Sequence, residues 1–592
     1  MLKLFKYFKW WYYPLILLIL GLTLIQVELD LDLIDYMREI ITLVGKANIT
    51  GESQTTAILN QGLEMLGISL VSILITIVIY YISARIGANF VKHLRKQLYD
   101  RIHDFSLEEI NQFQTSSLIT RSTNDITQVQ MVVIVLLRLA FAAPIMAVRA
   151  IQKIVDIDLT LSMPIAIAII VIILMISVIF IFVTPLFSKV QNLTDDLNQV
   201  TRENLTGLRV VRAHNAEGYE HSKFKKVNNE LTRMNLYVNR AMQMMMPGMM
   251  LVMNGVSLAV TWIAAILIQN QDLGANPLEG IAIQSQFSIY GIRILFAFMT
   301  LTMLFIMVPR GAVSGRRIYE VLKTTPKIKD PEQPKEMPSD QAVEVEFNNV
   351  CFKYPLAKEC VLENISFKAK AGQTVAFIGS TGSGKSTIIN LIPRFYDVTS
   401  GSITLNGVDI REIRQKDLLN YIGYIPQKGL LFSGTIESNL KIGKVDATEE
   451  EMIQALKTAQ AYDFVMEKEN QLQAEVAQGG KNFSGGQRQR LCIARAIIKQ
   501  PKIYIFDDSF SALDYQTDRK LRGALKEQTK SAINFIVAQR IGTIMNADQI
   551  IVLDQGKAVG IGTHKSLLST NKVYQEMAYS QLSKEELEDA SL

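Results

Sequence analysis

The sequence predicts a protein in two parts: an all-α half that spans a membrane, and a soluble half with an α/β fold. Two stretches of the first half, 159–188 and 241–271, contain no charged residue. Each is longer than the roughly 20 residues that a helix needs to cross the hydrocarbon layer. The second half instead alternates short apolar runs, such as 374–378 and 503–506, with helical segments. That alternation is typical of a mainly parallel sheet covered by helices.

Composition excludes several classes of protein. The chain has 592 residues, with 61 basic and 56 acidic side chains, so its net charge is only +5. A nucleic-acid-binding protein would need a strongly basic chain or patch, and we expect no nucleic-acid partner. Hydrophobic residues make up 49% of the chain, which excludes a mainly disordered protein. Three cysteines without metal-ligand spacing exclude a disulfide scaffold and a zinc site.

Four weaker apolar segments bring the expected number of membrane spans to six. The third span is interrupted by Arg138 and Arg149, and the last carries Arg293. We therefore expect a transmembrane domain over 1–323. Its spans are expected near residues 10–34, 60–84, 126–150, 159–188, 241–270 and 281–308.

Basic residues indicate the orientation in the membrane. They gather in the N-terminal segment and after the second, fourth and sixth spans, as in Lys3, Arg95, Arg212 and Arg317. The segment between the first two spans is acidic instead. Because basic loops stay inside, both termini and the soluble half are expected in the cytoplasm. The aromatic run 10–13 lacks a following cleavage site and indicates an interfacial belt rather than a signal peptide.

A linker is expected between the two halves. Residues 324–342 contain four prolines among charged residues. The polar segments 85–126 and 189–240 have helical periodicity, so the spans are expected to continue into the cytoplasm. The soluble domain is expected over 343–592.

A glycine-rich loop gives the soluble domain its first chemical assignment. Residues 379–386 match the G-x(4)-G-K-S pattern, follow the apolar run 374–378 and open a helix at Thr387. Backbone N–H groups of such a loop wrap a phosphate, and the helix N-terminus adds positive potential. Lys385 would contact the β- and γ-phosphates, and Ser386 would bind Mg²⁺. The predicted ATP-binding residues here are Gly379, Ser380, Thr381, Gly382, Ser383, Gly384, Lys385, Ser386 and Thr387.

Two acids follow a second apolar run. Asp507 and Asp508 end the segment that begins at Ile503, where an α/β sheet places its ligand contacts. Asp507 would hold Mg²⁺, and Asp508 is placed to orient or deprotonate the attacking water.

A second anion-binding helix start is predicted at Ser484, Gly485, Gly486 and Gln487. One nucleotide needs only one phosphate cradle, so this motif is expected to serve the nucleotide of a partner domain.

Taken in this order, the motifs resemble those of the ABC transporter family, specifically the type IV exporter half-transporters, over essentially the whole chain. The resemblance implies a six-helix, all-α transmembrane domain followed by an α/β P-loop nucleotide-binding domain, with ATP and Mg²⁺ as cofactors. It implies that Tyr354 stacks on adenine, that Gln427 lies near Mg²⁺, and that Asp514 belongs to the D-loop. It also implies that segments near 106–113 and 208–218 are coupling helices.

Two positions depart from the family pattern. Asp508 stands where glutamate is usual, and Gln539 stands where a histidine is usual. Aspartate withdraws its carboxylate by about 1 Å, and a misplacement of that size can cost about a hundredfold in rate. Glutamine cannot titrate near neutral pH. We therefore assign both as degenerate catalytic positions of a site that holds ATP and turns it over slowly.

This pattern resembles the degenerate-site member of the bacterial heterodimeric multidrug exporters. It implies a bacterial cell membrane and a partner half-transporter with Glu and His at the matching positions. The expected function is ATP-driven export of hydrophobic or amphipathic compounds, in contact with membrane lipids, by alternating access. A homodimeric lipid flippase or exporter, or an ATP-gated regulatory protein, remains an alternative. Met-rich span five and Arg293 line a substrate cavity or pack within the bundle; both interpretations stay open.

Overall fold

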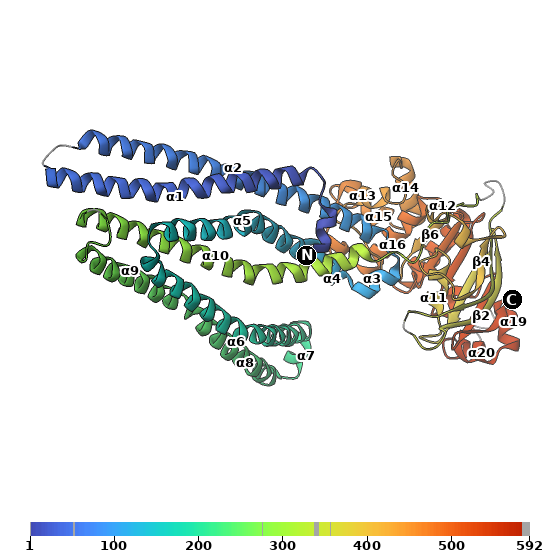
Figure 1. The fold of residues 1–592 in the computed structure, drawn as a ribbon. Coiled ribbons are helices and arrows are strands. Elements are labelled where there is room, and N and C mark those ends of the chain that lie inside the picture. Colours follow the sequence, from blue (N-terminus) through green and yellow to red (C-terminus); the bar gives the residue numbers. More distant parts are fainter. Residues whose placement is uncertain (1, 51–53, 275, 337–341, 356, 583–592) are drawn as a thin grey trace. The chain divides into compact units, whose positions relative to one another are not determined.

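The structure is a computed structural model that describes residues 2–50, 54–274, 276–336, 342–355 and 357–582 (Figure 1). The chain forms two compact units. The first, a helical unit, comprises Met1–His103 and Ser116–Thr324. The second, an α/β unit, comprises Asp104–Thr115 and Thr325–Leu592. A short piece from inside the helical half thus belongs to the α/β unit.

Among the described residues, six continuous helical stretches are long and apolar enough to cross a membrane, as the sequence predicts. In Figure 1, α1 and α2 run side by side, α5 packs along α10, and α6 packs along α8 and α9. The long helices are α1 (Tyr12–Thr50), α2 (Thr55–His103), α5 (Ile126–Ile157), α6 (Leu159–Thr206), α8 (Glu217–Gln243), α9 (Met245–Gln269) and α10 (Pro277–Lys323). The short ones are η1 (Leu2–Tyr7), α4 (Thr115–Thr120), η2 (Arg121–Asp125) and α7 (Leu208–Ala213).

Local sequence explains where two of the long helices begin. Asp158 caps α6 by accepting a hydrogen bond from the Leu161 backbone N–H. Asn276 caps α10 in the same way, and Pro277 occupies the first turn, where no backbone N–H is needed. A buried apolar core that includes Leu31, Phe287 and Val260 then joins α1, α9 and α10.

Large apolar side chains remain exposed along the same helices. Leu70, Ile170 and Leu251 are each at least 60% exposed. Such long rows of exposed aliphatic side chains are costly in water and are satisfied by lipid. The helical unit is therefore the part of the chain that lies in the membrane.

The α/β unit is built around a six-stranded sheet in the order β12-β11-β3-β10-β9-β6. All its pairings are parallel except that of β11 with β12, as expected for a mainly parallel sheet. The strands are β3 (Thr374–Gly379), β6 (Ile422–Ile425), β9 (Ile503–Asp507), β10 (Ile533–Val537), β11 (Gln549–Asp554) and β12 (Lys557–Gly562). Every residue of β9 is buried, because helices cover both faces of such a sheet.

A second, antiparallel sheet has the order β2-β1-β4-β5, which the sequence did not predict. Its strands are β1 (Glu344–Phe352), β2 (Leu362–Lys370), β4 (Ser400–Leu405) and β5 (Val408–Asp409). The alternation of charged and apolar residues at the start of β1 suits a sheet with one wet face. Strands β7 (Gly434–Thr435) and β8 (Glu475–Val476) form a separate pair.

Helices cover the sheets, and several of them share a second apolar core with β6 and β9, which contains Leu456, Leu491 and Val465. They are α11 (Lys385–Leu391), α12 (Gln415–Asn420), α13 (Ile436–Lys441), α14 (Glu449–Thr458), α15 (Tyr462–Met466), α16 (Gly485–Ile497), α17 (Tyr515–Gln528), α18 (Ile541–Ile544), α19 (His564–Thr570) and α20 (Lys572–Tyr579). Single turns lie at η3 (Ile410–Glu412), η4 (Gln471–Gln473) and η5 (Gln478–Gly480).

Helix α3 (Leu107–Phe113) is the piece of the first half that belongs to the α/β unit. Ser106 and Glu109 form a reciprocal capping box at its start. Glu109 is only 3% exposed and also accepts a hydrogen bond of 3.2 Å from the Lys327 backbone N–H. The Asn111 side chain donates to the Tyr396 hydroxyl at 3.2 Å. These contacts hold α3 on the α/β unit.

We predict that Glu109→Ala loosens α3. The variant leaves the Ser106 and Lys327 backbone N–H groups without their acceptor, at a cost of about 1–2 kcal/mol. Hydrogen exchange of the α3 amides should accelerate accordingly. Glu108→Ala is the matched control, because it removes only an ion pair with the exposed Lys327. Equal exchange in the two variants would contradict the anchoring role of Glu109.

Candidate functional site

The predicted phosphate loop lies between β3 and α11. A side chain at Gly379 would put its Cβ 2.2 Å from the Leu553 carbonyl oxygen, so only glycine fits there. Gly384 has a φ of 100°, a left-handed conformation that glycine adopts freely. The loop therefore turns sharply at the end of a buried strand and leads its backbone N–H groups into the start of α11.

Lys385 folds back over this loop. Its ammonium donates to the carbonyl oxygens of Gly379 and Ser380, at 2.8 and 2.7 Å. Burial lowers the pKa of Lys385, while the charges of Asp508 and Asp507 oppose that shift. A half-buried cation held only by carbonyl oxygens is suited to an anionic ligand. The Ser383 hydroxyl, which is buried and has no hydrogen-bond partner in the described part of the chain, also fits a phosphate.

The two acids lie at the end of β9, and each is only 8% exposed. Ser386 donates a hydrogen bond of 3.2 Å to Asp507 Oδ1. Burial raises the pKa of Asp507, and the neighbouring charge of Asp508 adds to the rise. Burial also raises the pKa of Asp508. A hydroxyl and a carboxylate brought together in this way are the hard oxygen ligands that Mg²⁺ prefers.

The two glutamines converge on one oxygen of Asp508. Gln427 donates to Asp508 Oδ2 at 3.2 Å, and Gln539 donates to the same oxygen at 2.9 Å. Asp508 has a φ of 46°, in the left-handed region that aspartate tolerates better than most residues. The structure thus brings the two departures from the family pattern, Asp508 and Gln539, into direct contact.

Tyr354 lies next to the loop. Its hydroxyl shares a hydrogen bond of 3.1 Å with the Thr387 hydroxyl. Its ring meets the ring of Tyr396 edge to face at 5.4 Å. Because Tyr396 also accepts the hydrogen bond from Asn111, side-chain contacts run continuously from α3 to the phosphate loop. Tyr396 and Asn111 are not predicted from the sequence, because residues 285 positions apart carry no local signal of their contact.

Residues 484–487, the second predicted anion-binding helix start and here called the signature, share no hydrogen bond with this cluster among the described residues. Ser484 caps α16 by accepting from the Gln487 backbone N–H, and Gln487 accepts from the Ser484 backbone N–H at 3.0 Å. A Cβ at Gly485 would meet nothing within 4 Å, so this helix start is open. Asp514 caps α17, and hydrogen bonds from Thr517 hold the pKa of Asp514 below its ordinary value. Within the described residues, no hydrogen bond joins Ser484 to the phosphate loop.

Comparison with known proteins agrees with this geometry. Residues 362–511 match the family profile "ABC transporter", and residues 37–307 match "ABC transporter transmembrane region". An uncharacterized ABC transporter ATP-binding protein of Mycobacterium tuberculosis is 40% identical over 90% of this chain and 90% of its own length. The chain belongs to the ABC transporter family.

Two further matches of this ABC transporter have lower sequence identity. An ATP-dependent lipid A-core flippase of Desulfotalea psychrophila is 30% identical over 87% of this chain and 89% of its own. The solved structure of a bacterial Atm1-family ABC exporter with ATP bound matches with a TM-score of 0.77. It is 24% identical and covers 94% of this chain and 96% of its own, so it shows the fold.

The family confirms the fold class and the ATPase assignment of the chain. It is a multi-pass membrane protein with an ATP-binding domain. The roles of the individual site residues stay predictions, and two of them lead to experiments on this structure.

The first concerns the buried carboxyl of Asp508. A carboxyl with a raised pKa in the folded state makes stability fall as pH rises from its ordinary value through the folded value. Asp508→Asn should therefore stabilise the nucleotide-free chain at pH 7.5 by about 1 kcal/mol. The gain should vanish below the ordinary carboxyl pKa. Thermal unfolding between pH 4 and pH 8 measures it.

Asp514→Asn serves as the control for this experiment. Its carboxylate is already stabilised by Thr517 and has a lowered pKa, so this variant should not stabilise the chain. A gain for Asp508→Asn that does not depend on pH would contradict the assigned burial effect.

The second concerns the contacts between α3 and the loop. Tyr396→Phe keeps the aromatic ring but removes the acceptor for Asn111. ATP should then protect the α3 amides from hydrogen exchange less than in the unmodified chain. Tyr424→Phe is the matched control, because that hydroxyl instead donates to Asn390. If ATP protected the α3 amides equally well in both variants, the contacts through Tyr396 would not link the loop to α3.

Proposed function

We propose that this chain is one subunit of a dimeric ABC exporter and that its own nucleotide site is the slow one. The partner is a second half-transporter with Glu and His at the positions of Asp508 and Gln539. The substrate is a hydrophobic or amphipathic compound, moved outward from a bacterial cell membrane by alternating access. Both termini and the α/β unit lie on the cytoplasmic side.

The double hydrogen bond to Asp508 is the observation that carries this proposal. Both amide donors bond the same carboxylate oxygen, Oδ2, so that oxygen is less available to accept a proton from an attacking water. The shorter side chain already sets the carboxylate back from the position of a glutamate. Gln539 can hold the γ-phosphate by hydrogen bonding but supplies no titratable group. The site is therefore suited to retain ATP more than to cleave it.

ATP and Mg²⁺ fit the residues of this site. Lys385 and the loop N–H groups would bind the β- and γ-phosphates. Ser386, Asp507 and the carbonyl oxygen of Gln427 would hold the ion, which supplies positive charge to those phosphates. Gln427 can do so because its hydrogen bond to Asp508 uses only the amide nitrogen.

The open signature helix supports the dimer. The N-terminus of α16 presents backbone N–H groups that this chain does not cover at Gly485. In a dimer this surface would complete the nucleotide site of the partner. The signature is intact while Asp508 and Gln539 are altered, which supports a competent site on the other subunit's loop.

A homodimeric lipid exporter is the second candidate. The flippase relative favours it, because 30% identity extends over most of both chains. In that case Asp508 would suffice for hydrolysis at both sites.

We predict that hydrolysis at this chain's own site can be restored. In a complex whose partner carries Glu→Gln at its catalytic position, Mg-ATPase activity should be near zero. Asp508→Glu together with Gln539→His in this chain should raise it at least tenfold, because the carboxylate regains its reach. Adding Lys385→Ala should abolish the gain, which shows that the restored site is the source.

The Mg-ATPase activity of the unmodified chain, purified alone, distinguishes the heterodimer from the homodimer. Near-zero turnover alone and robust turnover with the partner support the heterodimer. Full turnover by the single chain would reject the slow site and support the homodimer.

A further inference from the structure

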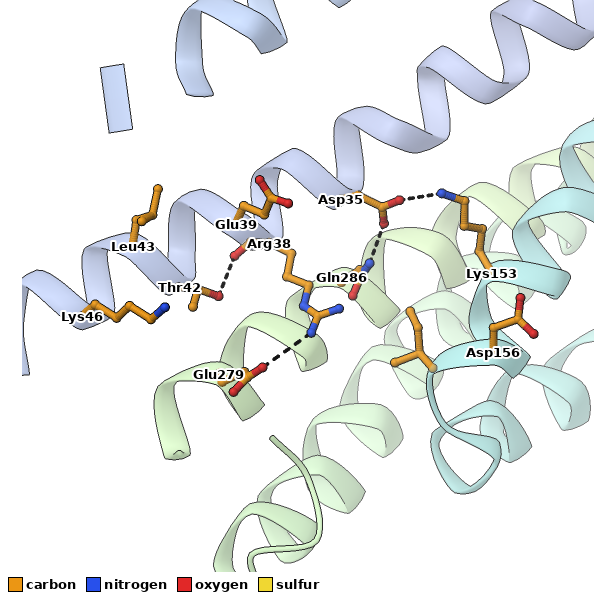
Figure 2. Close-up of a pocket in the computed structure, with 11 residues that line it drawn as sticks. Asp35, Arg38, Glu39, Thr42, Leu43, Lys46, Lys153, Asp156, Glu279 and Gln286 are labelled. Atoms are coloured by element: carbon orange, nitrogen blue, oxygen red, sulfur yellow. Dashed lines mark hydrogen bonds and ion pairs between the residues drawn. The ribbon is translucent and has the colours of Figure 1, made fainter. Parts of the chain in front are cut away.

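A charged cavity lies within the helical unit, between α1, α5 and α10. Its volume is about 590 Å³. Figure 2 shows Asp35 of α1 between Lys153 of α5 and Gln286 of α10, while Arg38 of α1 points toward Glu279 of α10. The charged residues of this set lie just outside the spans expected at 10–34, 126–150 and 281–308, where charge costs less, whereas Gln286 lies inside the last of them. This cavity has no part in nucleotide chemistry.

Gln286 is the unusual member of this set. The residue is only 3% exposed, and its amide nitrogen donates to Asp35 Oδ1 at 2.6 Å. Its carbonyl oxygen Oε1 is buried and accepts no hydrogen bond from any residue that the structure describes. A buried acceptor without a donor costs free energy, so such an atom calls for a ligand that donates.

The hydrogen-bond donors near Asp35 are already used by carboxylates and do not bond the Gln286 carbonyl oxygen. Asp35 already accepts from Tyr290 at 2.6 Å as well as from Lys153, also at 2.6 Å. Lys153 is further held by Asp32 at 3.2 Å. Its ammonium is therefore engaged between two carboxylates of α1.

Negative charge exceeds positive charge around the cavity. Four carboxylates line it, against three basic side chains. The carboxylates are those of Asp35, Glu39, Asp156 and Glu279. Arg38 pairs with Glu279 only loosely, at 3.7 Å. A ligand that enters this cavity is therefore favoured if it is a cation.

The side chains around the cavity are not suited to hold a simple metal ion. In the described part of the chain, no three carboxylate, histidine or cysteine side chains gather closely enough to hold one. An organic cation with N–H groups instead satisfies both requirements: it donates to an amide oxygen and it balances carboxylates at longer range. The cavity volume is ample for a small amine or a lipid headgroup.

We propose that this cavity binds a primary ammonium group, which donates to Gln286 Oε1 and is balanced by the exposed carboxylate of Asp156. Two sources share this chemistry: the headgroup of an aminophospholipid and a free amine in solution. Val44 and Val155, close in sequence to the lining residues of α1 and α5, are 45% and 47% exposed, as expected beside lipid. The site is independent of the nucleotide-site proposal, because its binding is measured without ATP.

The test uses the full chain in phosphatidylcholine nanodiscs. Ethanolamine is titrated while the thermal unfolding midpoint is followed, since a ligand of the folded state raises it. Tetramethylammonium is the matched probe, because it has the same charge but no N–H donor. Ethanolamine should raise the midpoint, and tetramethylammonium should raise it less.

Variants locate the binding. Asp156 is exposed, so the Asp156→Asn variant should fold normally. It should nevertheless bind ethanolamine about fivefold more weakly. Gln286→Met should remove the difference between the two probes. Asp196→Asn, an exposed acid of α6 outside the cavity, is the control and should change nothing. Equal responses to both probes, or an unchanged affinity in Asp156→Asn, would overturn the proposal.

A second set of nanodiscs identifies the source. Phosphatidylethanolamine replaces part of the phosphatidylcholine, and ethanolamine is titrated again. If the lipid headgroup occupies the cavity, the midpoint starts higher and the ethanolamine response is reduced. If the response is unchanged, the site takes a soluble amine.

Discussion

The parallel pairing of three buried strands is the constraint on which the nucleotide site depends. In their register Phe377 of β3 lies beside Val537 of β10, which lies beside Asp507 of β9. The phosphate loop, both acids and Gln539 therefore leave the sheet at the same edge. The strands are buried and almost wholly apolar, so this register is fixed by packing rather than by the polar groups at their ends. Any side chain placed directly after these strands reaches the site.

At that edge, burial and hydrogen bonding shift the pKa values of the two acids in opposite directions. Burial raises the pKa values of Asp507 and Asp508, and the two carboxylates would repel each other without a cation between them. Lys385, whose pKa is lowered by burial, and Arg540 supply positive charge near them. Two neutral glutamines rather than a titratable histidine hold Asp508. A site of this kind is suited to Mg-ATP, because the ligand brings both a divalent cation for the acids and an anion for Lys385.

Much of this could be predicted from the sequence because the signals are local. The uncharged runs predict the spans, and the phosphate loop, Asp507 and the Ser484 motif each lie within a few residues of the strand or helix that presents them. The antiparallel sheet was missed because it pairs strands that lie far apart in the chain, as Val345 of β1 with Leu405 of β4. Contacts between distant positions carry no such signal: Asn111 with Tyr396, Gln539 with Asp508, and the unsatisfied oxygen of Gln286 emerge only from the fold.

Retention of nucleotide by the complex tests the central claim, a site that binds ATP and cleaves it slowly, most directly. The complex of this chain with its partner is loaded with radiolabelled Mg-ATP, free nucleotide is removed, and the bound nucleotide is identified as ATP or ADP over time. The account predicts that half of the bound nucleotide stays intact as ATP through many turnovers of the other site. Conversion of all bound ATP to ADP at a single rate would contradict it.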